Sequence, residues 1–357
     1  MAANIWKLKS GGSELLTKKR GSGLLLCFPR RAPSATEVFD WYWRFAAERQ
    51  AIFFRRLSGA EPPWTEDAIL STFRFTNVYR ASDRVSQYLI QNVIYDEPHS
   101  LEDLFFRIIV FKLFNKIETW ELLDSQAGPI RYSKYRFDKY DEALTTAMRN
   151  KTRIYSSAYI MPSGGPNYLR KHRAHLWLLE TMMRDKLPQK LADCPSMKDA
   201  FALLLGYPMI GEFLAYQFVT DLNYSEVTNF SEMEFVAPGP GARSGIHKCF
   251  SDLCEWPEEE IIRWVAENQE AQFAERKLEF RSLRGRPLQL IDCQNLFCEI
   301  DKYARVRFPG ISGHLQRTRI KRKFESNPAP IAYWYPPKWG INADIDKGTG
   351  LVSAASV

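Results

Sequence analysis

The segment 203–248 constrains the fold of this chain most strongly, because helical patterns alternate in it with tight turns. Its sequence is LLLGYPMIGEFLAYQFVTDLNYSEVTNFSEMEFVAPGPGARSGIHK. We expect Gly206 to end a first helix by taking a positive φ, and Pro208 suits the turn that follows. A second helix would pack through apolar residues at helical spacing: Phe213, Leu214, Phe218 and Leu222. The segment therefore predicts two helices joined by a tight hairpin.

The same segment ends in a turn of glycine and proline that leads into another helix. Free backbone N–H groups at a helix start bind phosphate well, and a glycine lets the backbone approach a ligand closely. The candidate phosphate-binding residues of this region are Gly211, Gly239, Gly241, Arg243, Ser244 and Lys248. An ordinary helical hairpin with a surface turn would carry the same short motifs, so this alternative stays open.

Helical patterns also dominate the rest of the chain, and strand signals are few. Ser34 or Thr36 can cap a long helix that reaches about Arg56. Ser100 can cap a helix over 101–116 whose surface is nearly all apolar, and we expect this helix to be central and buried. These patterns predict a mainly α fold.

We expect the chain to divide into three parts. Residues 1–33 are basic and rich in glycine and form an N-terminal arm. Residues 34–325 form a helical domain with lobes near 36–190 and 191–325, which close on a cleft. Residues 326–357 form an aromatic and flexible C-terminal tail.

Two polar stripes on otherwise apolar helical patterns predict a substrate pocket. The stripes repeat at i, i+3, i+7 and i+10 and comprise Asn77, Arg80, Arg84 and Gln87 in the first, and Asp292, Asn295, Glu299 and Lys302 in the second. Burying such side chains costs free energy unless they are paired or functional. We expect the stripes to line the cleft together with Tyr159. Solvated faces with salt bridges are the alternative.

The charge of the chain fits a nucleic-acid partner without requiring one. Lysine and arginine number 49 against 42 acidic residues, a net charge of +7. A dense basic run can neutralise phosphates or simply be solvated, and it supplies the candidates Arg317, Arg319, Lys321 and Arg322. No stretch of about 18 apolar residues occurs, so we expect no membrane span and, by default, a cytoplasmic protein. We also expect a monomer.

We expect neither a metal nor a cofactor. Cysteine occurs six times, and two pairs share a C-x4-C spacing. Side chains five positions apart on a helix point away from each other, so neither pair makes a natural chelate.

Four motifs in order identify a family resemblance that covers about residues 70–310. They read FTNVYRASDRV, GYPMIGEFLAYQ, EMEFVAPGPGARSGI and CQNLFCEIDKYAR. Together they resemble the alpha-glutamyl/putrescinyl thymine pyrophosphorylase-like family, whose members look like distant relatives of helix-hairpin-helix DNA glycosylases. The resemblance therefore implies a glycosylase-like arrangement of two helical lobes.

The family has two branches that this sequence could join. A bacterial anti-phage defence branch consists of glycosylases that remove glucosylated hydroxymethylcytosine from phage DNA. A phage branch consists of transferases that place an amino acid or polyamine on pyrophosphorylated hydroxymethyluracil in DNA. We expect the first function, with double-stranded phage DNA carrying modified bases as the partner, and keep the second as the alternative.

The resemblance also implies roles for single residues. The base would be flipped out, and a carboxylate would stabilise the positive charge that develops on the sugar. The position of that acid falls near Glu234 and Glu232, with Asp221 in reserve. Phe213 stands where lyase-active relatives carry lysine, so a monofunctional glycosylase is expected. Met209 replaces the first glycine of the hairpin.

Overall fold

The computed structural model describes residues 31–164, 170–315, 317–326 and 332–343, and their fold is mainly α, as the sequence predicts. The α-helices are α1 Glu37–Leu57, α2 Ala68–Thr72, α3 Arg84–Tyr88, α4 Leu101–Phe114, α5 Ile117–Ala127, α6 Phe137–Arg149, α7 Lys171–Arg184, α8 Leu187–Ala192, α9 Met197–Leu205, α10 Glu212–Leu222, α11 Pro240–Cys249, α12 Glu258–Glu267, α13 Gln269–Glu275 and α14 Leu290–Arg307. Shorter helical turns are η1 Arg80–Ser82, η2 Leu89–Ile94, η3 Tyr132–Lys134 and η4 Pro337–Trp339. Strands β1 Ser34–Ala35 and β2 Phe250–Asp252 pair antiparallel. Within these residues, no helix is long and apolar enough to cross a bilayer.

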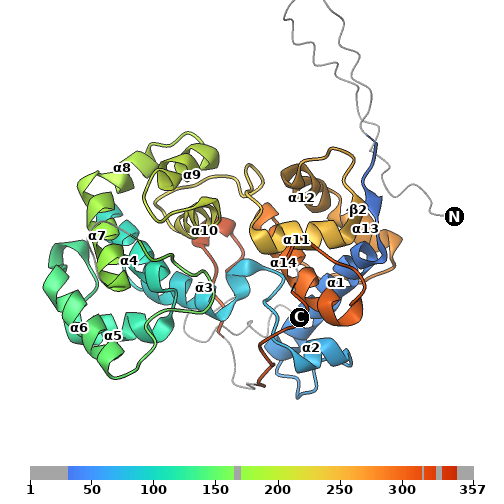
Figure 1. The fold of residues 1–357 in the computed structure, drawn as a ribbon, viewed down its shortest axis with the longest axis horizontal. Coiled ribbons are helices and arrows are strands. Elements are labelled where there is room, and N and C mark those ends of the chain that lie inside the picture. The colour runs from blue at the N-terminus through green and yellow to red at the C-terminus, as the bar shows by residue number, and fades with distance from the viewer. Residues whose placement is uncertain (1–30, 165–169, 316, 327–331, 344–357) are drawn as a thin grey trace, which may run out of the picture.

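The helices gather in two groups (Figure 1). Helices α1 and α2 lie with α11 to α14, and α1 packs directly against α11 and α14. Helices α3 to α10 form the second group around α4, which contacts α5, α7, α8 and α10. The first helix of the chain thus joins its last helices, so these groups do not coincide with consecutive lobes near 36–190 and 191–325.

Helices α1 and α4 begin where their capping residues predict. The Thr36 hydroxyl accepts a hydrogen bond from the backbone N–H of Val38, and the Ser100 hydroxyl accepts one from that of Asp103. Helix α4 ends at Asn115, which adopts the left-handed conformation. Eleven of its fourteen residues are buried, which confirms the prediction of a central apolar helix.

The predicted hairpin joins α9 to α10, but it turns at a different residue from the one we expected. Gly206 keeps a helical φ of −67°, whereas Met209 takes a positive φ of 66°. The left-handed residue is therefore the methionine that replaces the first glycine of the hairpin. An L side chain in this region costs about 1 kcal/mol.

The C-terminal aromatic stretch is docked on the helical domain over the part that the structure describes, residues 332–343. Tyr335 is buried and its hydroxyl lies 2.9 Å from that of Ser82. The backbone N–H of Trp334 donates to Gln87 at 2.8 Å. The expectation of a flexible tail is therefore wrong for this stretch. The N-terminal arm lies, except for residues 31–33, outside the described residues.

Glycines of α11 allow this helix to pack closely against α14. A Cβ atom at Gly245 would lie 1.9 Å from the backbone oxygen of Phe297, and one at Gly241 would lie 3.0 Å from the Sγ atom of Cys298. Real Cβ atoms essentially never come closer than 3.0 Å, so α11 cannot carry a side chain at Gly245 without moving. The glycines of the motif EMEFVAPGPGARSGI thus serve helix packing.

Gly245→Ala is expected to lower the free energy of unfolding by about 1–3 kcal/mol, because the two helices must separate to admit the methyl group. Gly211→Ala is the control, since a Cβ there would meet no atom within 4 Å and its φ of −89° suits alanine. Urea denaturation of both variants measures the effect. Equal stability of the two variants would contradict the close packing.

Candidate functional site

A buried ion cluster joins three distant parts of the chain. Arg80 of η1 is 1% exposed, and its guanidinium donates to both carboxylate oxygens of Asp221 in α10, at 2.7 and 3.0 Å. The Nζ atom of Lys112 in α4 lies 3.0 Å from the second of these oxygens. Two cations therefore share one carboxylate, which leaves the cluster with a surplus of positive charge.

Polar neighbours complete the cluster but leave one donor unused. The Nε atom of Arg80 donates to the Gln217 side-chain oxygen at 3.2 Å, and Nη1 donates to the Tyr224 hydroxyl at 3.1 Å. Lys112 donates to the Asn115 side-chain oxygen at 2.7 Å. The Nε2 atom of Gln217 is buried and has no hydrogen-bond partner within the described residues. Since buried donors are normally satisfied, this amide indicates a place for an acceptor atom.

The electrostatics of the cluster favour an ionised carboxylate. Burial raises the pKa of Asp221, but the charges of Arg80 and Lys112 outweigh it and bring the pKa below its ordinary value. Burial lowers the pKa of Lys112, and Asp221 opposes this shift. An anionic ligand would relieve the desolvation of the lysine, because it would supply a second negative charge.

Two aromatic rings cover the cluster. The ring centre of Tyr159 lies 4.8 Å from the Nζ atom of Lys112 and 6.0 Å from the guanidinium carbon of Arg80. The ring stacks parallel to Phe213, with centres 5.7 Å apart and an interplanar angle of 6°. Tyr159 has a positive φ of 53°, so this half-buried residue is held in a strained backbone conformation. Of the predicted pocket residues, Tyr159 and Arg80 thus lie at one site.

The first polar stripe does not form a helical face. The Asn77 side chain donates to the backbone oxygen of Ser82 at 2.6 Å, and its backbone N–H donates to Asp83 at 2.8 Å. These bonds close a loop, and α3 begins only at Arg84. The Arg84 side chain is 69% exposed and lies 3.8 Å from Glu118. The prediction of one stripe along a helix is therefore wrong, because local side-chain bonds compete with the helix.

The second stripe does lie on one helix, α14, and it holds the loop that carries Arg80. The Asp292 carboxylate accepts a hydrogen bond from the backbone N–H of Arg80 at 2.8 Å, and Glu299 accepts one from that of Thr76 at 3.1 Å. Both acidic residues are buried. The two predicted stripes therefore meet, with acidic side chains of α14 fixing a backbone loop.

The outer members of the second stripe lie farther from the ion cluster. The Nζ atom of Lys302 forms an ion pair with Glu299 at 2.6 Å. Asn295 is half-buried on the same helix. Their part in a substrate pocket remains a prediction.

The pKa of Asp292 gives a test by pH. Burial raises it to about 7, although two backbone N–H groups oppose the shift. The pKa of an unfolded aspartate is about 3.9. Between about pH 3.9 and about pH 7, Asp292 is therefore protonated in the folded state but ionised in the unfolded state. Wild-type stability should therefore fall, relative to Asp292→Asn, as pH rises from about 4 to 7, by at most about 1.4 kcal/mol per pH unit. Urea denaturation across this range measures the difference, and parallel pH profiles would contradict it.

The acidic loop places its two glutamates in different surroundings. The carboxylate of Glu232 is largely buried and lies 2.8 Å from Arg286, whose guanidinium stacks over Trp339. Burial raises the pKa of Glu232. Glu234, the expected catalytic residue, is exposed and accepts a hydrogen bond from the N–H of Met197, the first residue of α9. Glu234 therefore stabilises a helix start.

Two predicted phosphate-binding side chains lie within the core. Ser244 donates to Asp301 at 2.8 Å, and the Nζ atom of Lys248 lies 3.1 Å from the same carboxylate oxygen. All three residues are buried. Gly239 packs against Phe213, whose ring a Cβ atom would approach to 2.6 Å. Ser244 and Lys248 are thus engaged within the core and are not available to DNA.

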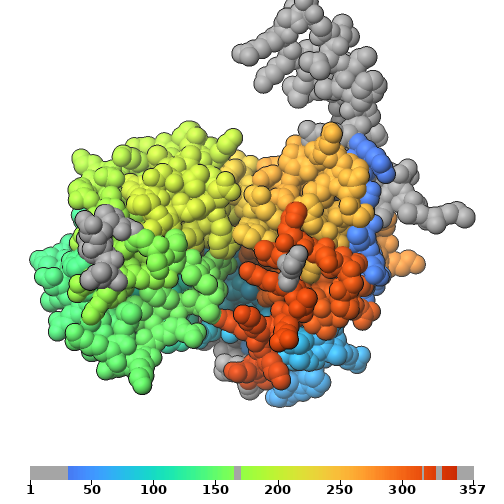
Figure 2. All heavy atoms as spheres, in the orientation of Figure 1, coloured from blue at the N-terminus to red at the C-terminus, as the bar shows by residue number. Residues whose placement is uncertain are grey.

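Other predicted phosphate contacts remain on the surface. Gly211 and Arg243 are exposed, and Arg243 forms ion pairs with Glu258 at 3.4 Å and Glu212 at 3.9 Å. The basic run is exposed at all four candidates: Arg317, Arg319, Lys321 and Arg322. Figure 2 shows that the molecule is hollowed between its two groups of helices. Contact of these residues with DNA remains a prediction.

A large cavity lies elsewhere. A cavity of about 1080 Å³ opens beside α1 and α2, and Trp41, Asp67 and Tyr303 are among its lining residues. None of the residues of the ion cluster lines it. We place the candidate site at the cluster because buried charges with an unused donor indicate binding chemistry more directly than open volume does.

Sequence reasoning missed Lys112 and Gln217 as site residues. Lys112 lies within a helix that is otherwise nearly all apolar, and it is buried there. A lysine at such a position needs a partner, and this signal was present in the sequence. Gln217 lies on the buried face of α10 and carried no comparable signal.

Comparison with known proteins assigns the chain to a family. Residues 36–313 match the family model described as "5-hmdU DNA kinase, helical domain". The chain is similar to a 5-hmdU DNA kinase of Bacillus phage SP10, with 26% identity over an alignment of 297 residues that covers 77% of this chain. The aligned part spans 46% of that relative. No solved structure matches.

These findings correct the expected function. A DNA glycosylase of anti-phage defence that hydrolyses the N-glycosidic bond is contradicted, because both matches describe a DNA kinase. The transferase alternative fits them better. Since the matched model covers most of the chain, the chain belongs to the 5-hmdU DNA kinase helical-domain family.

Proposed function

We propose that this chain recognises 5-hydroxymethyluracil in double-stranded DNA and positions its 5-substituent for group transfer. The observation that carries the proposal is the buried cluster in which Arg80 and Lys112 share the single carboxylate of Asp221. The description of the family supplies the substrate class. The cluster supplies the chemistry, because it suits an oxyanion.

The proposed transfer places a negatively charged phosphate group on the 5-hydroxymethyl oxygen of the substrate. The hydroxyl oxygen of the 5-hydroxymethyl group forms a bond to the γ-phosphorus of a nucleoside triphosphate. The bond from that phosphorus to the bridging oxygen breaks, the nucleoside diphosphate leaves, and the hydroxyl proton is released. The resulting phosphate monoester carries a charge of about −1.5 to −2 at neutral pH. The relative is about twice as long as the part that aligns, so we assign to this chain the acceptor side of the reaction.

The cluster is suited to such a phosphate. A guanidinium and an ammonium form strong, charge-assisted hydrogen bonds to phosphate oxygens. The unused N–H of Gln217 offers a further donor beside them. Asp221 keeps the two cations in place in the absence of ligand. Its single negative charge balances only one of the two positive charges, so the cluster can still attract another anion.

A base reaches this cluster only after it leaves the DNA stack. The Tyr159 ring now lies over both cations and stacks on Phe213. A flipped pyrimidine is a planar ring and would take this place, with its 5-substituent directed at Lys112 and Arg80. The strained backbone of Tyr159 makes its departure less costly. The exposed basic residues of the run 317–323 would hold the DNA backbone.

Binding to three duplexes tests the proposal. They differ at one position only, which carries thymine, 5-hydroxymethyluracil or its phosphate monoester. We expect the affinity to rise in this order, with a gain of about 10–100-fold for the phosphate, because each hydrogen bond to a charged group contributes about 1.5–3 kcal/mol. Fluorescence anisotropy at fixed salt measures the three dissociation constants. Equal affinities for the three duplexes would contradict the proposal.

A further inference from the structure

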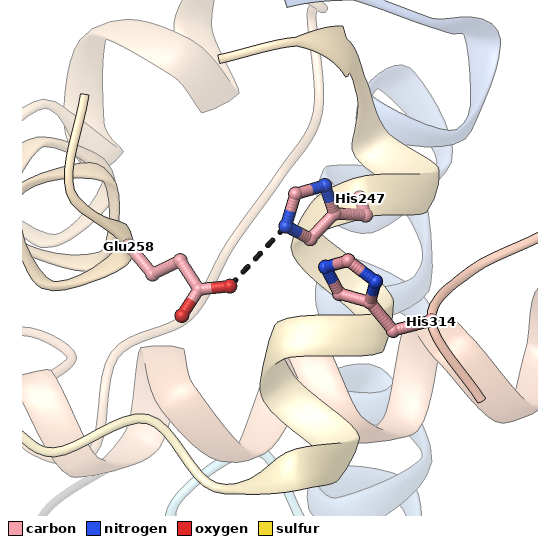
Figure 3. Close-up of side chains that lie close together, drawn as sticks. All are labelled: His247, Glu258 and His314. Atoms are coloured by element: carbon pink, nitrogen blue, oxygen red, sulfur yellow. Dashed lines mark hydrogen bonds and ion pairs between the residues drawn. The ribbon is translucent and has the colours of Figure 1, made fainter. Parts of the chain in front are cut away.

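Two histidines and a glutamate meet at a second place on the molecule, outside the ion cluster. They are His247 of α11, Glu258 at the start of α12, and His314 of the segment after α14 (Figure 3). One ligand atom from each lies within 4.8 Å of the other two. Figure 3 shows a ring nitrogen of each histidine turned toward the carboxylate. Three separate segments thus bring metal-binding atoms to one point.

The contacts within this trio favour a shared cation. The ring centres of His247 and His314 are only 3.8 Å apart, and the His247 ring nitrogen lies 3.2 Å from Glu258. Two imidazoles so close together repel each other when both are protonated. Neutral imidazoles are the form that binds a metal.

The chemistry of the ligands selects the type of metal. Two imidazoles and one carboxylate suit Zn²⁺ and related transition metals, whereas Mg²⁺ prefers oxygen ligands. Tetrahedral bonds of about 2.0–2.1 Å place ligand atoms about 3.3 Å apart. His314 is exposed, so its side chain is free of the packing that fixes core residues. Arg243 lies 3.4 Å from the other oxygen of Glu258 and orients the carboxylate.

We propose that His247, Glu258 and His314 form a binding site for a transition-metal ion, with Zn²⁺ as the expected metal. The fourth position is open to water or to an outside ligand. The ion ties the segment after α14 to α11 and α12, and this segment continues directly into the basic run 317–323. The metal therefore fixes the start of a surface that is rich in arginine and lysine. This inference does not depend on the proposed function.

Metal titration of the chelator-treated full chain tests the site. We expect one equivalent of Zn²⁺ to bind with a submicromolar dissociation constant, and His314→Ala or His247→Ala to weaken binding at least 100-fold. His99→Ala is the matched control. His99 lies with Asp96 and Glu97 in a second group of possible metal ligands among the described residues. Stoichiometric binding that survives both histidine substitutions, or is lost only in His99→Ala, would overturn the proposal, as would the absence of binding.

Two further measurements keep the proposal falsifiable if a variant folds poorly. Co²⁺ bound to the wild-type chain should show the intense visible absorption of a tetrahedral nitrogen and oxygen site, and Zn²⁺ should displace it. Zn²⁺ should also slow cleavage by trypsin after Arg317 and Arg319, at least severalfold. A weak octahedral spectrum together with an unchanged cleavage rate would contradict the site.

Discussion

Asp221→Asn is expected to lower the free energy of unfolding by about 3–5 kcal/mol, the usual cost of leaving a buried charge without its partner. The carboxylate bonds to both Arg80 and Lys112, and all three residues are buried. Asparagine has nearly the same shape but removes the charge that pairs with both cations. Urea denaturation at neutral pH measures the loss.

Asp193→Asn is the matched control, since this aspartate is exposed.

The pKa of Asp221 is lowered in the folded state. Its contribution to the free energy of unfolding is therefore present above the unfolded pKa of about 3.9 and is lost as pH falls through the folded pKa. The difference between wild type and Asp221→Asn should therefore shrink in strong acid. A loss below about 1 kcal/mol at neutral pH would mean that the cluster does not stabilise the fold.

Lys112→Met is expected to reduce affinity for the duplex with the phosphorylated base by about 10–100-fold, because it removes one charged hydrogen-bond donor. Methionine fills the space of the lysine stem, and Asp221 keeps both bonds to Arg80. Affinity for the thymine duplex should stay within about twofold. Anisotropy titrations of both duplexes with both proteins measure the change.

Lys116→Met controls for charge on the same side of the molecule. Lys116 is more exposed than Lys112 and pairs with Glu118 at 3.0 Å, outside the cluster. An equal loss of affinity for all duplexes in Lys112→Met would indicate general electrostatic attraction. A similar loss in Lys116→Met would exclude a specific role of the cluster.

Features that depend on neighbouring residues were predictable from the sequence. The caps at Thr36 and Ser100 and the apolar character of α4 are local properties, and they set the mainly α fold correctly. The loop at 77–83 was not predictable in this way. Its polar residues have helical spacing, but hydrogen bonds between side chains and backbone close a loop there instead. Met209, rather than Gly206, takes the left-handed turn because helix packing on both sides fixes the hairpin.

The ion cluster could not be derived from sequence periodicity. Arg80 and Asp221 lie 141 positions apart, and only the tertiary fold brings them together. The family motifs contain Arg80, Gln217 and Gly245, which serve the cluster and the packing of α11 on α14. The motifs thus contain residues that hold the fold and the cluster together, and they did not identify the reaction that the family comparison indicates.

The phosphorus NMR signal of the modified base tests the central claim most directly. A duplex that carries one phosphorylated 5-hydroxymethyluracil has a single monoester resonance, distinct from the backbone diesters. The free monoester titrates with a second pKa of about 6. If Arg80 and Lys112 hold this phosphate, its pKa in the complex must fall by about one unit or more, and Lys112→Met must restore much of the difference. A monoester whose titration is unchanged in the saturated complex would contradict the account.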